Sequence, residues 1–264
     1  MTIKTFTASI LCSLSLVLSP SLSADDAQDK GLAIAKEMKS RDRGWVDSSA
    51  DMEMVLRSRG GRETRREMRI LSLEVQNDGD KSMTIFDSPN DVKGTAFLSF
   101  THNNADDDQW LYLPALKRVK RIASKNKSGP FMGSEFSYED LSSFEVEEYD
   151  YRWLRDEEFN GKLCFVVEII PRDKYSGYTR EIVWIDQEHY RAMKIEFYDR
   201  KDGVLKTLTL SDYQLHLDKF WRPAKQTMQN ERNGKTTEVL LRNYQFRSGL
   251  DEQDFTENSL KRAR

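Results

Sequence analysis

Residues that could perform chemistry are few in this chain, and they form no catalytic or metal-binding pattern. The three histidines, His102, His189 and His216, are scattered, and none has a partner at metal-ligand spacing on a helix. The acidic run Asp106–Asp108 lacks the glycine and the distal glutamate of a calcium loop, so we interpret it as a solvated turn. No phosphate-binding glycine loop and no G-x-S-x-G elbow is present. We therefore expect no enzyme, no metal and no cofactor.

The most informative stretch, Asp108–Asp140, has the composition of a binding element. An alternating aromatic strand, Gln109–Leu113, stops at Pro114. A polar loop leads on to Gly129–Phe136, which we call the hook. Between strand and loop lie four cations, which we call the basic run: Lys117, Arg118, Lys120 and Arg121.

The basic run has two interpretations. Lys and Arg discourage edge-to-edge pairing of strands, so the run fits an exposed sheet edge. It also fits a docking site for anionic lipid headgroups or for an acidic partner. Nucleic acid is not an expected partner, because the chain begins with an apolar segment typical of exported proteins. Both interpretations remain open from the sequence.

The hook combines apolar side chains with flexible backbone. Phe131, Met132 and Phe136 are apolar, and Gly129 and Gly133 allow the segment to bend. These side chains could be plain core, but methionine adapts to irregular ligands. We interpret the hook as a flap over an apolar cavity.

Two strands before the hook supply further candidates for the lining of that cavity. Ala96, Leu98 and Phe100 share one face of a strand, and Trp110 and Tyr112 share one face of the next. We therefore predict a lipid-binding surface made of these five residues and the three apolar residues of the hook. The choice of face depends on register, because a shift of one residue exchanges the two faces of a strand.

The N-terminal segment 1–24 is typical of a secretory signal peptide. Lys4 supplies positive charge, an apolar stretch follows at Ala8–Leu18, and small residues allow cleavage after Ser23 or Ala24. The apolar stretch is too short to span a bilayer, which argues against the alternative of an uncleaved anchor. We expect a soluble exported protein.

Composition indicates one well-solvated domain over residues 25–264. Charged residues make up 32%, and 41 Lys and Arg nearly balance 44 Asp and Glu. This balance gives no global preference for polyanions. Cleavage leaves one thiol, Cys164, in an apolar stretch, where we expect a small core side chain and no disulfide. We expect a monomer.

The order of elements predicts a mainly β protein with a few helices. An amphipathic helix around Ala27–Met38 comes first and must lie on an apolar surface. About a dozen strands follow in up-and-down order, with Asn-Gly and Asp-Gly turns at Asn160, Asp202 and Asn233. No regular crossover helices interrupt them, which favours an unclosed, strongly curved antiparallel sheet.

Two short helices are expected among the strands. Ser137 is placed to cap one of them, with Phe136 and Leu141 as a hydrophobic staple. Thr256 is placed to cap the other, near the end of the chain.

The chain resembles the family of outer-membrane lipoprotein-sorting proteins, in a LolA-like branch. The resemblance covers nearly the whole mature chain and lacks the motifs of the LolA carrier proper. The matching motifs are Lys93–Leu98, Gln109–Pro114, Arg118 with Arg121–Ile122, Phe131–Ser134, Phe136–Asp140 and the Phe255-Thr256…Leu260 ending.

The resemblance implies an unclosed β-barrel with helices over its open side. It also implies a periplasmic carrier or chaperone for a lipid or lipidated protein on its way to the outer membrane, with acylated cargo or phospholipid as ligand. An RND-type inner-membrane exporter is an implied partner. The alternative is a non-enzymatic accessory subunit of such a transporter that binds protein in place of lipid.

Overall fold

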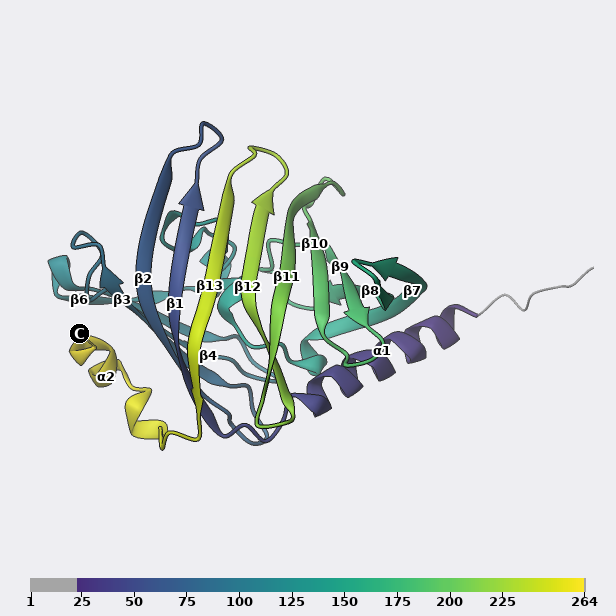
Figure 1. Cartoon of the computed structure of the whole chain (residues 1–264), viewed down its shortest axis with the longest axis horizontal. Helices are drawn as coiled ribbons and strands as arrows, with labels where there is room; N and C mark the ends of the chain where they lie inside the picture. The colour runs from purple at the N-terminus through teal and green to yellow at the C-terminus, as the bar shows by residue number, and fades with distance from the viewer. Residues whose placement is uncertain (1–22, 264) are drawn as a thin grey trace, which may run out of the picture.

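A single antiparallel sheet of thirteen strands forms the body of the protein (Figure 1). The computed structural model describes residues 23–263. The strands are ordered β6-β5-β4-β3-β2-β1-β13-β12-β11-β10-β9-β8-β7. The first and last strands of the chain are thus neighbours, and the sheet is open between β6 and β7. The predicted fold, a curved sheet that does not close, is confirmed.

The strands are joined mostly by short hairpin turns. Their bounds are β1 Asp47–Arg57, β2 Glu63–Leu73, β3 Lys81–Ser88, β4 Ala96–Phe100, β5 Asp108–Leu113, β6 Arg118–Ile122, β7 Tyr149–Phe159, β8 Lys162–Pro171, β9 Arg180–Asp186, β10 Ala192–Tyr198, β11 Val204–His216, β12 Phe220–Asn230 and β13 Thr236–Phe246.

The predicted Asx-Gly turns form as expected. Asn160 and Gly161, which join β7 to β8, both have positive φ, 50° and 73°. This backbone geometry matches the right-handed twist of the flanking strands, and Asn and Gly adopt it at little cost. The turn residues therefore fix the β7–β8 pairing, in which Phe159 lies opposite Lys162.

Helix α1, Ala24–Arg41, lies along β7 at one end of the sheet (Figure 1). It begins with a capping box between Ser23 and Asp26. Ile34 and Ala35 are buried against a cluster that includes Val167 and Ile185. This placement confirms that the first helix lies on an apolar surface of the sheet.

A C-terminal segment covers the outer face of the other end of the sheet. The 3₁₀ turn η6 (Glu252–Asp254) leads into helix α2 (Glu257–Arg262), and Thr256 caps it as predicted by accepting from the Ser259 N–H at 3.0 Å. Phe255 and Leu260 are buried against Met83 and other residues of the outer face.

The connection from β6 to β7 spans the opening of the sheet and carries the hook. It contains four 3₁₀ turns: η2 Ser124–Asn126, η3 Phe131–Gly133, η4 Glu139–Leu141 and η5 Val146–Glu148; a fifth, η1 Pro114–Leu116, precedes β6. The helix predicted after Ser137 is reduced to η4. The Ser137 hydroxyl lies 2.9 Å from the Tyr178 hydroxyl and caps no helix, because Tyr178 offers a buried partner.

Some sequence predictions concern features outside these elements. The predicted signal peptide, 1–24, falls almost entirely outside the described residues and stays a prediction. Within residues 23–263, no helix is long and apolar enough to cross a membrane. Cys164 is fully buried, as expected, and burial raises the pKa of its thiol to about 11.

Candidate functional site

The hook lies inside the concavity of the sheet. Phe131 is only 1% exposed, and its ring centroid lies 5.9 Å from that of Phe86 and 5.3 Å from that of Phe97. Tyr138 contacts it edge-on at 5.7 Å. The surrounding cluster draws apolar side chains from strands on both sides of the opening, from β1 to β6 and from β10 to β13. A single segment can contact so many strands only from within the curve.

Beneath the hook the sheet leaves a cavity of about 260 Å³, which we call the inner cavity. Phe131, Phe136, Asp140 and Leu141 close it from the side of the hook. The opposite wall combines seven apolar side chains with four small hydroxyls, Gln226 and Arg222. The residues contributed by the sheet and its edge are Trp45, Ser48, Met52, Met54, Ile70, Ser72, Ser82, Thr84, Arg222, Gln226, Val239, Leu241 and Tyr244.

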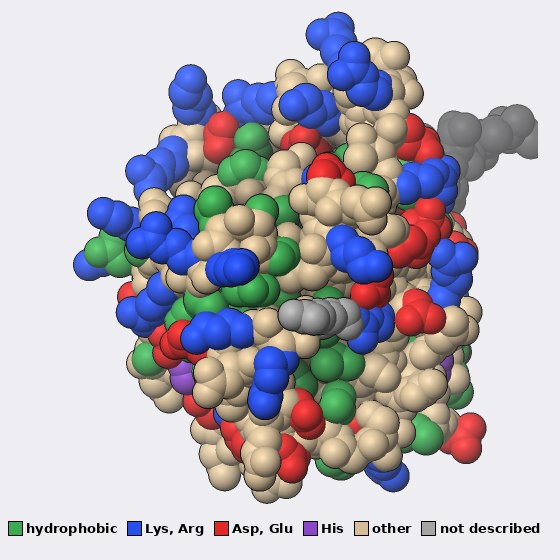
Figure 2. Space-filling view, turned by 90° about the vertical axis from the view of Figure 1, so that its left-hand side faces the viewer, with side chains coloured by type: hydrophobic (Ala, Val, Ile, Leu, Met, Phe, Trp, Pro, Cys, Tyr) green, Lys and Arg blue, Asp and Glu red, His purple; other side chains and the backbone are tan. Residues whose placement is uncertain are grey.

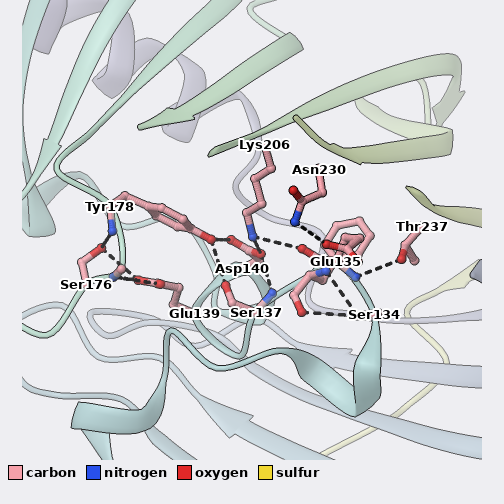
Figure 3. Close-up of polar contacts among 12 residues, drawn as sticks. Ser134, Glu135, Ser137, Glu139, Asp140, Ser176, Tyr178, Lys206, Asn230 and Thr237 are labelled. Atoms are coloured by element: carbon pink, nitrogen blue, oxygen red, sulfur yellow. Dashed lines mark hydrogen bonds and ion pairs between the residues drawn. The ribbon is translucent and has the colours of Figure 1, made fainter. Parts of the chain in front are cut away.

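Hydrogen bonds fasten the hook to strands β11–β13 (Figure 3). The Glu135 N–H donates to the Thr237 hydroxyl at 2.9 Å, and the Asn230 amide donates to the Glu135 carboxylate at 2.7 Å. The Lys206 ammonium donates to the Glu135 carbonyl at 3.2 Å. Glu135 thus ties the hook to three neighbouring strands at once.

A buried ion pair completes this attachment. Lys206 pairs with Asp140, and both side chains are only 5% exposed. Asp140 also accepts from the Tyr178 hydroxyl at 2.7 Å and from the Ser137 N–H at 2.6 Å (Figure 3). We call Glu135 and Asp140, with their partners Lys206, Tyr178, Asn230 and Thr237, the anchor cluster.

Burial governs the protonation of the groups around the anchor cluster. Burial raises the pKa of Glu181 to about 8, with the charges of Asp140 and Glu139 adding to the effect and Lys206 opposing it. Burial also raises the pKa of Tyr178 well above its usual range. At neutral pH Glu181 is therefore mostly protonated, which leaves Asp140 as the ion-pair partner of Lys206.

The eight residues predicted to bind lipid do not form one surface. Phe131 and Phe136 line the inner cavity, and Met132 packs beside them. The five strand residues lie on the opposite, outer face, where Ala96 and Leu98 are fully buried beside α2 and Phe100, Trp110 and Tyr112 pack against the same cluster.

The cause of this separation is the register of the two strands. On the concave side β4 presents Phe97 and β5 presents Leu111, which both belong to the cluster around the hook. The expected face is thus displaced by one residue. Binding of lipid by any of the eight residues stays a prediction.

The basic run lies at the free edge of β6 and in the turn before it. Lys117, Arg118, Lys120 and Arg121 are all exposed, and Arg121 pairs with Asp108. Leu116 next to them is 66% exposed. Figure 2 looks onto this side of the molecule and shows Lys and Arg side chains standing out from its upper half. The structure places these cations where they both protect an edge and face solvent.

The described residues contain no group of histidine, cysteine and carboxylate side chains that could hold a metal ion. His102 lies 2.8 Å from Asp78, and hydrogen bonds with Asp78 and Asp108 raise its pKa in spite of its partial burial. His216 instead packs against the rings of Tyr244 and Phe246, so the histidines lie in separate surroundings.

Sequence reasoning missed the polar fastening of the hook and most of the wall of the inner cavity. Met52, Met54 and Ile70 were recognisable as alternating strand residues, but no local signal marks them as cavity lining. Lys206 and Asp140 are 66 residues apart and form a pair only through the curvature of the sheet.

The fold and the cavity define a class of protein: a curved, unclosed antiparallel sheet that holds an apolar cavity beneath a connecting segment. Ligand sites of this kind are mostly apolar, with few polar groups.

Comparisons with known proteins place the chain within that class. A family model described as "uncharacterized protein" matches residues 78–262. A crystal structure described as an outer membrane lipoprotein-sorting protein domain from Vibrio parahaemolyticus is 58% identical, with a TM-score of 0.87, over 89% of this chain and 99% of that one. The chain belongs to this family of outer-membrane lipoprotein-sorting proteins.

Two further structures agree with this assignment. A DUF1329 family protein from Desulfovibrio piger is 29% identical, with a TM-score of 0.84, over 89% of this chain and 99% of that one. A LolA superfamily protein from Nitrosomonas europaea is 19% identical, with a TM-score of 0.70, over 87% and 98%, and shows the shared fold. A comparison with curated proteins finds no match.

Proposed function

We propose that the protein is a periplasmic carrier that binds an acyl chain of a lipid or lipidated protein and transfers it towards the outer membrane. The observation that carries this proposal is the apolar inner cavity beneath a segment that closes it. Family membership supports it, because a 58% identical relative is described as a lipoprotein-sorting domain.

The size of the inner cavity implies that the hook moves when cargo binds. Its volume of about 260 Å³ is below the ~300–1,000 Å³ of ordinary ligand sites. Phe131 and Phe136 occupy space that an acyl chain would need. Cargo therefore replaces hook side chains in the concavity, and the hook acts as an internal competitor.

The basic run serves docking in this proposal. Its cations and the exposed Leu116 suit an anionic membrane surface or an acidic partner such as an RND-type inner-membrane exporter. Replacing all four cations with Glu should leave thermal unfolding nearly unchanged, because exposed ion pairs contribute under about 1 kcal/mol. The same variant should lose attachment to vesicles containing phosphatidylglycerol. A large fall in melting temperature would contradict the docking role.

Titration with a fluorescent long-chain fatty acid tests the carrier proposal. The wild type should bind it saturably, with one ligand per chain. Ile70→Trp should weaken binding by about tenfold or more, because the larger side chain fills the inner cavity. Leu163→Trp is the matched control, because Leu163 is 55% exposed on the surface. Native mass spectrometry of protein purified from the periplasm should identify the cargo.

The seated hook also favours a second candidate function. A concavity already filled by Phe131 and fastened by the anchor cluster suits an accessory subunit of an envelope transporter that binds protein on its surface. Absence of saturable acyl-chain binding by the wild type and by Phe131→Ala would favour this alternative and contradict the carrier.

A further inference from the structure

A second and larger cavity lies beside the inner one and has different chemistry. It has a volume of about 670 Å³, within the range of ligand sites, and we call it the outer cavity. It lies between the C-terminal end of α1, residues 143–144, and strands β10–β12. Arg222 lines both cavities, so the two adjoin at this side chain.

Cations outnumber anions in the lining of the outer cavity. The cations are Lys39, Arg41, Arg191, Lys219 and Arg222, and the carboxylates are Asp42, Asp80 and Asp218. Buried carboxylates already hold two of the cations. Arg191 pairs with Asp186, and Lys39 pairs with Glu145; each of these two carboxylates is 1% exposed. Three cations are left to interact with a ligand.

These three cations have partners that a ligand could replace. Arg222, itself 17% exposed, pairs with Asp42, which is 49% exposed, and Arg41 pairs with Glu37, which is 44% exposed. Arg41 also donates to the Glu188 carbonyl at 3.0 Å, and Lys219 donates to the carbonyl of Arg43. The pair of Arg41 and Glu37 is exposed on both sides and contributes about 0–1 kcal/mol, and both carboxylates can turn to solvent, so a ligand oxyanion can replace them. The C-terminal end of α1 carries a partial negative charge that opposes binding of an anion. Lys39 and Arg41 lie in the last turn of the helix, and their positive charges offset it.

Aromatic rings supply an apolar surface next to these cations. The centroid of the Trp221 ring lies 4.8 Å from the centroid of the His189 ring and 4.5 Å from Cζ of Arg191. The Arg41 guanidinium lies 4.3 Å from the Tyr190 ring. Guanidinium groups next to aromatic rings offer charged and apolar contacts side by side. A ligand with a charged end and an apolar chain can use both.

We infer that the outer cavity binds the anionic headgroup of an amphiphile whose acyl chain enters the inner cavity, with Arg222 at the junction. The recognised chemistry is a phosphate or carboxylate oxyanion joined to a hydrocarbon chain. Arg222 and Arg41 hold the oxyanion, because guanidinium groups donate two parallel hydrogen bonds to such groups. This inference rests on the proposed carrier function and specifies its ligand class.

Calorimetric titration with two single-chain lipids of equal chain length tests the inference. Lysophosphatidylglycerol carries a phosphate oxyanion, and the monoacylglycerol carries none. The wild type should bind the anionic lipid about tenfold more tightly. Arg222→Gln and Arg41→Gln should each remove most of this preference while changing affinity for the neutral lipid less than about twofold. Arg41 is 43% exposed, so the second variant remains informative if the first folds poorly.

Arg232→Gln is the matched control, because Arg232 is 43% exposed and pairs with Asp199 away from both cavities. It should bind both lipids as the wild type does. Equal affinity of the wild type for the two lipids would overturn the headgroup site and leave the carrier function intact. Failure to bind either lipid would overturn both. Inorganic phosphate that binds as tightly as the anionic lipid would show a free-anion site and also overturn the inference.

Discussion

The buried pair between Lys206 and Asp140 should control whether the hook stays seated, and Lys206→Met is the cleanest way to break it. Methionine keeps most of the apolar stem and removes the ammonium group, so Asp140 loses its counter-charge at a site only 5% exposed. Removing one partner of a buried pair costs about 3–5 kcal/mol. The hydrogen bonds from Tyr178 and Ser137 still stabilise the carboxylate, which places the loss near the lower end, about 3 kcal/mol.

Urea unfolding at pH 7 measures this loss. A domain stability of about 5–15 kcal/mol leaves Lys206→Met folded, with a lower midpoint and an unchanged slope. Asp140→Asn should also destabilise, and the double variant should lose less than the sum of the two, with a coupling energy of about 2 kcal/mol. Lys162→Met is the control; its pair with Glu188 is largely exposed and should contribute under about 1 kcal/mol.

Hydrogen exchange locates the effect within the molecule. In Lys206→Met the amides of Phe131, Ser134 and Glu135, which donate to Phe136, Phe131 and Thr237, should exchange faster, while the β1–β2 pairing stays protected. A loss under about 1 kcal/mol, no coupling with Asp140→Asn, and unchanged exchange in the hook would together refute the idea that this pair holds the hook.

Three further changes test other parts of the structure. Gly31→Ala would bring a Cβ within 2.8 Å of the Trp153 backbone nitrogen. Overpacking should therefore outweigh the ~1 kcal/mol gain in helix propensity and lower the free energy of unfolding by about 1–2 kcal/mol. Gly60→Ala is the control and should not lower it, because no atom lies within 4 Å of the added Cβ. Phe131→Ala should cost about 3–5 kcal/mol in urea unfolding, because the ring is only 1% exposed, and a far smaller loss would show the hook to be a loose flap. Burial raises the pKa of Glu148 from about 4.5 to about 8, so folding stability should fall as the pH rises between these two values, because the unfolded state releases the proton first. Relative to the wild type, Glu148→Gln should therefore gain no stability below about pH 4.5 and an increasing amount up to about pH 8 in pH-dependent unfolding.

Local sequence signals were sufficient to predict most of the strands. Alternation places Ile195 and Phe197 on one face of β10, and turns such as Asn233-Gly234 mark hairpin ends. The pairing of β1 with β13 leaves no such signal, because it joins residues almost 200 positions apart, such as Ser48 and Phe246. That pairing determines where the sheet opens, and therefore which segment covers the opening.

The choice of face on β4 shows why the candidate site was harder to predict. Ala96, Phe97, Leu98 and Ser99 are all buried, because the hook covers one face and the C-terminal segment covers the other. A strand buried on both faces has no polar side to mark solvent, so periodicity cannot tell the cavity side from the outer side. Arg222 is likewise unpredictable as a cavity residue, because its partner Asp42 lies 180 positions earlier in the chain.

For the proposed carrier, the free energy that holds the hook in the concavity would decide which cargo can enter. Withdrawing Phe131 and Phe136 from the concavity costs about 3–6 kcal/mol, at about 1.5–3 kcal/mol for each buried ring. Separating Lys206 from Asp140 adds about 3 kcal/mol. A buried methylene contributes about 0.8 kcal/mol, so about eight to eleven methylenes offset the opening. Short fatty acids should therefore leave the hook in place, and the long chains of phospholipids and lipidated proteins should displace it. In the proposed carrier, the contacts that hold the hook in the concavity would thus select cargo by length.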